Sequence, residues 1–161
     1  MPPIAPLTLA ALRRAHDLID RDYAEGLDLD AMAREAGYSK YHFARTFALA
    51  YGETPRAYLT RRRVERAKSL LRTANLSVTE VCLLVGFESL GSFSSLFRRL
   101  VGQSPSAYRA SSLAAGTAPP IPGCMVLMWT RPTDRGPQPR RSAATIADVW
   151  SKTKTRQEDN P

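Results

Sequence analysis

The chain has 161 residues and a formal net charge of +8, which suits one ordinary domain or two very small ones and is too short to add a separate ligand-binding barrel. Residues 1–110 hold 16 Lys/Arg against 11 Asp/Glu, and residues 111–161 hold 7 against 4, so a basic excess that favours polyanionic partners is spread over the whole chain. Two cysteines without metal-ligand spacing, and no apolar run near the ~20 residues of a membrane span, predict a cytoplasmic protein without a disulfide framework, metal or cofactor.

Two helices are predicted before residue 37. The first begins at a Thr8 N-cap and runs to about Asp22. Its apolar stripe contains Leu9, Leu12, Ile19 and His16, which we interpret as a packing residue. The second helix has Asp28 as its cap, and Gly37 ends it where a left-handed backbone is needed. Its apolar positions follow helical spacing and are Leu29, Met32, Ala33 and Ala36.

A third and a fourth helix are predicted after Gly37. Ser39 is the expected cap of the third helix, which Gly52 ends and whose buried face comprises Phe43, Phe47 and Tyr51. Thr54-Pro55 then combines a capping residue with a proline at the first helical position, and nothing breaks the helix before about Thr73. The inward positions of this long helix are Tyr58, Val64, Ala67, Leu70 and Leu71.

The same order of signals returns after residue 76. Ser77-Val-Thr-Glu80 is a capping box at the start of a helix whose apolar positions are Val78, Val81, Cys82 and Val85. Gly86 ends this helix, and Ser89 caps the next one. Gly102 followed by Ser104-Pro105 then repeats the helix end and helix start seen earlier at Gly52 and Thr54-Pro55. The buried face of the helix after Ser89 is predicted to be Phe93, Leu96, Phe97, Leu100 and Val101.

One supersecondary unit is therefore present twice, in residues 37–58 and 86–108. The separation is 49 residues at the glycine and 50 from the first phenylalanine onward, so the second copy holds one extra residue in its turn. In order, the matched residues are Gly37, Tyr38, Phe43, Phe47, Gly52, Pro55 and Tyr58, answered by Gly86, Phe87, Phe93, Phe97, Gly102, Pro105 and Tyr108.

A short apolar helix, a glycine turn and a second helix are typical of the helix-turn-helix, with small Ala33 and Cys82 where its helices cross. An ordinary αα-hairpin is the alternative, but two copies with matched terminators favour the helix-turn-helix. The predicted fold is all-α, a homeodomain-like tandem of units at about 28–51 and 77–101 joined by a linker helix at about 55–73.

The segment SVTEVCLLVGFESLGSFSSLFRRLVGQSPSAYR resembles the signature of the AraC/XylS family of bacterial transcription regulators. The segment SKYHFARTFALAYGETPRAYLTRRRVERAKSLL resembles the family's other helix-turn-helix and its linker helix, so residues 8–110 are covered. The resemblance implies a seven-helix domain, here 1–110, that inserts two helices into consecutive major-groove segments of double-stranded DNA. It further implies a short standalone regulator of the MarA and SoxS type, an activator that binds DNA as a monomer and recruits RNA polymerase.

Candidate base contacts of the first unit lie opposite Phe43 and Phe47, where Tyr41, Ala44, Arg45 and Ala48 must face outward. Arg45 is the strongest of these, because a guanidinium makes bidentate hydrogen bonds to guanine. The resemblance also implies that Arg45 contacts DNA bases and that Tyr41, at the family's aromatic position, contacts DNA.

The second unit presents a chemically poorer face, with Leu90, Gly91, Ser94, Ser95 and Arg98 outward. Leu90, Gly91 and Ser95 are its candidate base contacts, and we expect sequence discrimination to come mainly from the first unit. Candidate contacts to the DNA backbone lie near helix N-termini or add charge nearby. They are Ser39, Lys40, His42, Ser89, Arg98 and Arg99. The basic residues of the linker helix are predicted to be mostly solvated, with one or two reaching the backbone: Arg61, Arg62, Arg63, Arg66, Lys68 and Arg72.

Residues 111–161 lie outside the resemblance. Ser111 to Gly123 is predicted to be a linker, and the segment from Cys124 to Trp129 a short strand or a segment docked on the helical core, the latter preferred. Residues 130–142 are expected to be disordered, and Ile146, Val149 and Trp150 mark one helical stripe. Cys124 is interpreted as an inert thiol.

Other classes of function fit the sequence less well than DNA binding. DNA-repair methyl acceptors fuse a domain of this kind to a zinc-bound cysteine site, which two lone cysteines cannot build. No catalytic residue is therefore assigned. A helical protein-interaction module, or an effector-responsive repressor acting through the tail, remain the alternative hypotheses.

Overall fold

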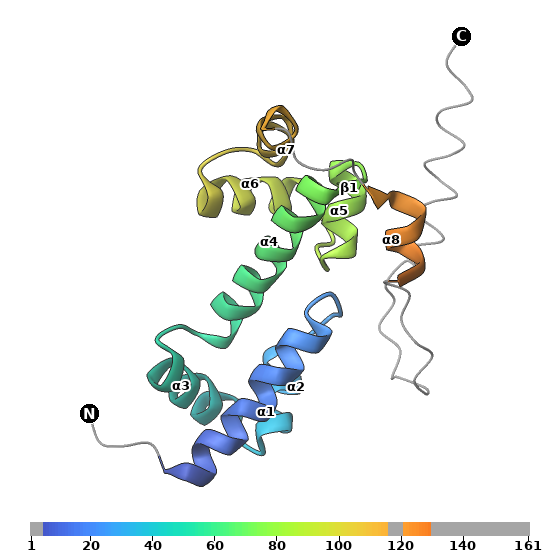
Figure 1. The fold of residues 1–161 in the computed structure, drawn as a ribbon. Coiled ribbons are helices and arrows are strands. Elements are labelled where there is room, and N and C mark those ends of the chain that lie inside the picture. The colour runs from blue at the N-terminus through green and yellow to red at the C-terminus, as the bar shows by residue number, and fades with distance from the viewer. Residues whose placement is uncertain (1–4, 116–120, 130–161) are drawn as a thin grey trace. The chain divides into compact units, whose positions relative to one another are not determined.

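The computed structural model describes residues 5–115 and 121–129 of the chain, and within them the helices follow the predicted order (Figure 1). They are α1 (Pro6–Asp22), α2 (Leu29–Ala36), α3 (Lys40–Tyr51), α4 (Pro55–Thr73), α5 (Val78–Leu84), α6 (Leu90–Val101), α7 (Pro105–Ala114) and α8 (Gly123–Trp129). Two-residue strands, β1 (Ala74–Asn75) and β2 (Ile121–Pro122), pair in parallel. The prediction of an all-α fold with two helix-turn-helix pairs and a linker helix is confirmed.

The N-terminal subdomain consists of α1, α2, α3 and the first turns of α4. Its core is apolar side chains that these four helices bury together, because each helix presents one apolar stripe. The buried members are Leu12, Ala15, Ile19, Met32, Ala33, Ala36, Phe43, Phe47, Tyr58 and Leu59. His16 packs as predicted, with its ring centroid 5.1 Å from that of Tyr51 and 4.6 Å from that of Tyr58.

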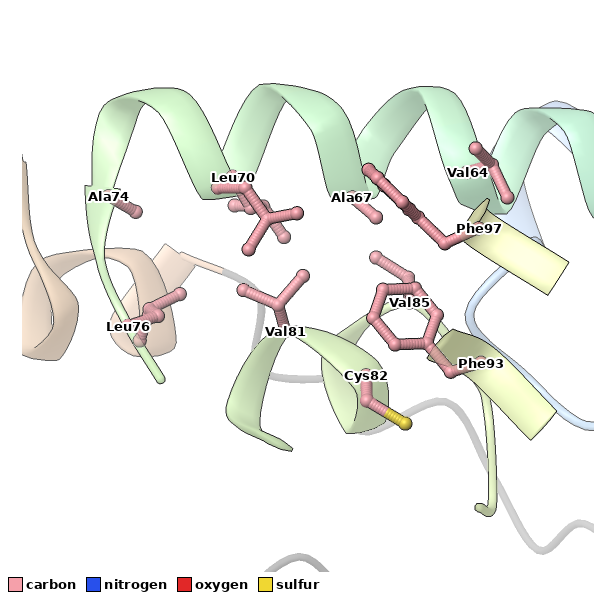
Figure 2. Packing of buried hydrophobic residues seen from close by; sticks show 11 residues of the cluster. Val64, Ala67, Leu70, Ala74, Leu76, Val81, Cys82, Val85, Phe93 and Phe97 are labelled. Atoms are coloured by element: carbon pink, nitrogen blue, oxygen red, sulfur yellow. The ribbon is translucent and has the colours of Figure 1, made fainter. Parts of the chain in front are cut away.

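The C-terminal subdomain consists of the later turns of α4 together with α5, α6, α7, β1, β2 and α8. Figure 2 shows side chains of α4 facing those of α5 and α6 across its core. The buried members are Val64, Ala67, Leu70, Leu71, Ala74, Leu76, Val81, Cys82, Val85, Phe93 and Phe97. Burial raises the pKa of the Cys82 thiol to about 11, as expected for a core cysteine. Helix α4 thus contributes to both cores.

The two copies of the repeat have the same backbone hydrogen bonds at their glycine turns. Gly37 N–H donates to Arg34 and Tyr38 N–H to Ala33, while Gly86 N–H donates to Leu83 and Phe87 N–H to Cys82. Both pairs form the Schellman motif, which satisfies the last carbonyls of a helix. Gly37 and Gly86 have φ of 73° and 85°, so the left-handed turn predicted for each is confirmed.

Aromatic packing is duplicated as well. The ring centroids of Phe43 and Phe47 lie 5.5 Å apart, and those of Phe93 and Phe97 lie 5.6 Å apart. Each second phenylalanine also meets the tyrosine that follows, Phe47–Tyr58 at 6.0 Å and Phe97–Tyr108 at 5.7 Å, in the edge-on geometry that aromatic rings favour. The repeated sequence therefore encodes one packing unit used twice.

Three predicted details of the helices are wrong. Thr8 is not the cap of α1: the N-cap is Ala5, three residues earlier, because Pro6 occupies the first helical position with its preset φ. Ser39 takes the predicted N-cap position with an extended backbone, but its hydroxyl accepts no capping hydrogen bond, since backbone geometry alone does not fix a serine rotamer. Leu100 is 52% exposed because it opens onto a groove beside α4 instead of facing the core.

The C-terminal extension departs from the sequence prediction in its secondary structure. Helix α7 continues through Ala114, past the start of the predicted linker, and residues 123–129 form a helix instead of a strand. Val126 packs against the core of the C-terminal subdomain, so the preferred interpretation of a docked segment is confirmed. A Cβ at Gly123 would lie 2.8 Å from the Asn75 carbonyl oxygen, which explains a glycine at this close approach. The residues predicted to be disordered, and the stripe at Ile146, lie outside the described residues.

Candidate nucleic-acid interface

Helix α3 has an apolar face in the core and an outward face with two functional side chains. Phe43 and Phe47 are fully buried, whereas Tyr41 is 87% exposed and Arg45 is exposed. Tyr41 and Arg45 are four residues apart, so they lie on the same side of the helix. Ala44 and Ala48 are half-buried and leave space beside the arginine. The face can therefore offer a phenol and a planar guanidinium to one surface.

Two candidate backbone contacts on α3 already have partners in the free protein. The Lys40 Nζ lies 2.8 Å from a carboxylate oxygen of Asp30, whose hydrogen bond and charge raise the pKa of Lys40. His42 is exposed, and its ring meets that of Tyr38 edge-on at a centroid distance of 4.8 Å. Lys40 is consequently held near the N-terminus of α3, beside Ser39, where amide donors and the helix dipole favour anions.

Helix α6 buries a pair of phenylalanines as α3 does, but the side chains on its outward face are different. Leu90 is 42% exposed, and Gly91 and Ser95 are exposed, opposite the buried Phe93 and Phe97. Apolar Leu90 can contact a thymine methyl group, and the Ser95 hydroxyl can form a single hydrogen bond to a base. This face lacks a side chain with two parallel donors at the position equivalent to Arg45.

The N-terminus and the last turn of α6 carry its candidate backbone contacts. The Ser89 hydroxyl accepts a hydrogen bond from Ser92 N–H at 3.4 Å, so its capping role is confirmed, in contrast with Ser39. Arg98 and Arg99 are both exposed, and Arg99 faces the groove that lines α4. Neither arginine takes part in an ion pair within the described residues, so each can contact a polyanion without first breaking one.

Arg61, Arg66 and Arg72 on the linker helix are exposed, in keeping with the predicted solvated face, but three of the arginines also have partners outside α4. Arg61 Nη2 lies 2.7 Å from Glu53, and Arg62 Nε lies 2.6 Å from Asp20. Arg63 is half-buried and donates to two backbone carbonyls. Intramolecular partners outside α4, which the sequence of a single helix does not reveal, therefore bind three of these side chains.

One exposed residue was missed by sequence reasoning. Leu49 is 52% exposed and lies four residues after Arg45 on α3. The spacing from Phe43 and Phe47 would have placed it outside the core, but leucine is ordinarily taken as a core residue. It extends the outward face of α3 with apolar surface.

Neither a metal cluster nor a membrane-crossing helix is found within the described ranges. No three side chains of His, Cys, Asp or Glu gather there in a way that could hold a metal ion. The helices of residues 5–115 and 121–129 also lack the combination of length and apolar character that crossing a bilayer demands.

Comparison with known proteins places this architecture in a family. Residues 32–111 match the family model described as "Helix-turn-helix domain". The HTH-type transcriptional activator AarP of Providencia stuartii is 38% identical over 93 residues, which are 58% of this chain and 69% of AarP. The virulence regulon transcriptional activator VirF of Yersinia enterocolitica is 32% identical over 116 residues, 67% of this chain but only 43% of VirF.

Solved structures agree with the sequence relatives. The DNA-binding domain of AdpA, a global transcriptional factor crystallised with a target DNA, has a TM-score of 0.64 and 34% identity, covering 66% of this chain and 96% of that domain. An AraC-type regulator from Chromobacterium violaceum has a TM-score of 0.60 and 30% identity, covering 65% and 93%. Two helix-turn-helix pairs on a shared linker helix define the DNA-binding domain of an AraC-type transcription regulator. The chain belongs to the AraC/XylS family and is a DNA-binding regulator, not an enzyme.

Proposed function

We propose that the chain activates transcription by inserting α3 and α6 into consecutive major-groove segments of one DNA site. Both helices are the second members of a helix-turn-helix pair, and both pack on parts of α4. Helix α4 has 19 residues and, at ~1.5 Å per residue, is roughly 28 Å long. Successive major-groove faces are ~34 Å apart, so the length of α4 suits adjacent turns of the duplex.

Sequence discrimination, in this proposal, comes mainly from α3. Arg45 would donate two hydrogen bonds to a guanine, and Tyr41 would pack on a base methyl group or a sugar edge. Ala44 would allow close approach of the helix to the groove. Helix α6 would contribute Leu90, Gly91 and Ser95, which provide van der Waals contact and at most single hydrogen bonds. One observation supports this asymmetry: at equivalent exposed positions of two matched scaffolds, α3 has an arginine, Arg45, and α6 has a serine, Ser95.

The DNA backbone would be held by groups at both ends of the recognition helices. Ser39, Lys40, His42 and Ser89 lie at or near helix N-termini, and Arg98 and Arg99 add positive charge on α6. Each phosphate that such a residue neutralises releases counterions, so affinity would fall as salt rises.

Activation and stoichiometry extend the proposal beyond DNA binding. The relatives AarP and VirF are transcriptional activators by name, which supports recruitment of RNA polymerase by this chain. Two recognition helices in one chain allow a bipartite site to be filled by a monomer. We also propose that residues 1–110 suffice for DNA contact and that the protein acts in the cytoplasm.

Selection of bound sites from random duplex DNA tests the core of the proposal. The expected result is a bipartite consensus with two halves about one helical turn apart, of which one is more strongly constrained. Footprinting should then protect both halves at a one-to-one ratio of protein to DNA. Protection of one groove segment only, or no enriched sequence, would contradict the proposal and favour a protein-interaction module. In vitro transcription with RNA polymerase on the selected site would separate an activator from a repressor.

A further inference from the structure

The loop between α1 and α2 makes contacts beyond its own subdomain. Arg63, on α4, extends its side chain to this loop, where Nε donates to the Tyr23 carbonyl at 2.7 Å and Nη2 donates to the Glu25 carbonyl at 2.8 Å. Along α4, Arg63 lies between Leu59, which enters the N-terminal core, and Val64, which enters the C-terminal core. The arginine is therefore located where the two subdomains meet.

The turn of the second helix-turn-helix also contacts this loop and Arg63. The Arg63 guanidinium carbon lies 5.7 Å from the centroid of the Phe87 ring, within the range of a cation–π contact. A Cβ added at Gly86 would lie 2.6 Å from the Ala24 carbonyl oxygen, so the two backbones are in close contact. Loop 23–25 of one subdomain and turn 86–87 of the other thus pack around one guanidinium.

The chemistry of this contact suits arginine better than any other residue. Tyr23 directly follows the last residue of α1, and the final carbonyls of a helix lack intrahelical partners and carry partial negative charge. A guanidinium holds its donors in a rigid plane and can serve two carbonyls at once while its face lies on a ring. Desolvation lowers the pKa of Arg63, and the negative charge of Glu88 acts in the opposite direction. The carbonyl and ring contacts help to offset the cost of removing the guanidinium from water.

We propose that Arg63 is a positioning residue that fixes α3 and α6 relative to each other and so sets the spacing between the two half-sites that the protein accepts. The inference rests on the proposed two-helix mode of binding. Helix α4 connects the subdomains covalently and packs into both cores, but a long helix can still curve along its length. The contacts of Arg63 add a second connection between the subdomains, separate from the α4 backbone. Subdomains that are connected at two places rotate less relative to each other than subdomains connected at one.

A measurement without DNA tests the mechanical part. Spin labels on Leu49→Cys and Leu100→Cys, both exposed leucines on α3 and α6, report the distance between these helices in a Cys124→Ser background, where Cys82 stays buried. The intact protein is expected to give one narrow distance distribution. Arg63→Met, which keeps the apolar stem and removes every donor, should broaden it. Arg72→Met is the matched control, because it removes the same charge from an exposed position on α4 and should leave the distribution narrow.

The functional part is tested on the site selected from random DNA, with two base pairs inserted or removed between its halves. Such a change rotates one half-site by about 70° around the duplex axis. The intact protein and Arg72→Met should lose at least about tenfold in affinity, comparable to the loss of one good base contact. Arg63→Met should lose less than about threefold, with unchanged affinity for an isolated half-site, since no base contact is touched.

The outcomes separate the inference from the proposed function. Narrow distances and unchanged spacing preference in a folded Arg63→Met variant would overturn the role of Arg63 while leaving two-helix binding intact. Absence of a bipartite site for the intact protein would overturn the proposed function, although the distance measurement would still judge the contact itself. If Arg63→Met does not fold, Arg63→Lys replaces it. That variant keeps the charge but cannot hold two carbonyls in a planar fork, so intermediate broadening is expected and a narrow distribution would refute the proposal.

Discussion

The two helix-turn-helix units differ on the outside far more than on the inside. Their turns share the same hydrogen bonds, and their phenylalanine pairs have nearly the same ring separation. On the outward face, however, Tyr41 and Arg45 of α3 are replaced by Gly91 and Ser95 of α6. Packing geometry tolerates little change, because a core is dense and a turn needs particular dihedral angles. Exposed positions are free of both constraints, so the repeat can keep one scaffold and carry two different surfaces.

The second difference concerns the environment of each turn. Space beside Gly37 is open, whereas the backbone at Gly86 presses against the α1–α2 loop. The C-terminal unit is therefore attached to its neighbour through its turn, and the N-terminal unit is not. Equivalent substitutions in the two copies should separate what the repeat itself requires from what this added contact requires.

Matched deletions of the core aromatic rings should have the largest effect. Phe47→Ala and Phe97→Ala each remove a fully buried ring from one core, and each should lower the free energy of unfolding by about 3–5 kcal/mol. Denaturant titration followed by circular dichroism measures both. Because each ring packs on the preceding phenylalanine and on the tyrosine of the next helix, the two losses should agree within about 1 kcal/mol, an uncertainty typical of context. A large loss at one position with a negligible loss at the other would show that the copies are not energetically equivalent.

Alanine substitutions at the two glycine turns should distinguish the cost of a strained backbone from the cost of a steric clash with the α1–α2 loop. Gly37→Ala places a side chain at φ 73° in open space, so we expect a loss of about 1–2 kcal/mol from the left-handed backbone alone. Gly86→Ala adds a Cβ 2.6 Å from the Ala24 carbonyl oxygen and should cost clearly more than Gly37→Ala in the same denaturant titration. Equal losses would mean that the α1–α2 loop moves aside freely and does not hold the second turn.

Arginine removal should sharpen the comparison of the outward faces. Arg45→Ala is expected to weaken discrimination between the selected site and a site with one altered base pair by about 1–3 kcal/mol, because a bidentate contact is lost. Ser95→Ala should change it by less than about 1 kcal/mol, in keeping with a single neutral hydrogen bond. Fluorescence anisotropy at two salt concentrations gives both values. A greater effect of Ser95→Ala would reverse the assignment of the dominant recognition helix.

Serine caps provide the smallest contrast. Ser77 accepts from Glu80 N–H at 3.1 Å in a complete capping box, so Ser77→Ala should cost about 1 kcal/mol of stability. Ser39 occupies an N-cap but its hydroxyl accepts no capping hydrogen bond, and Ser39→Ala should change stability by no more than a few tenths of a kcal/mol. Thermal unfolding of both variants is the measurement. A comparable loss from Ser39→Ala would indicate that its hydroxyl does bind the first turn of α3 in solution.

Sequence patterns alone predicted most of the helices. Helix α4 was placed at its observed ends because a capping threonine, a proline and a long unbroken stretch are local signals that need no neighbour. The repeat supplied the turns and the outward positions of Tyr41 and Arg45, since residues opposite a buried stripe must face outward.

What lay beyond the sequence depended on partners distant along the chain. Arg63 looked like one of several solvated arginines, yet its carbonyl acceptors lie about forty residues earlier and Phe87 lies on a turn that only folding brings near. The same holds for α8, whose helix and docking depend on β1 and Leu76. Periodicity and capping are short-range properties and can be deduced from neighbours in sequence, whereas the pairing of a side chain with another subdomain is a consequence of tertiary structure alone.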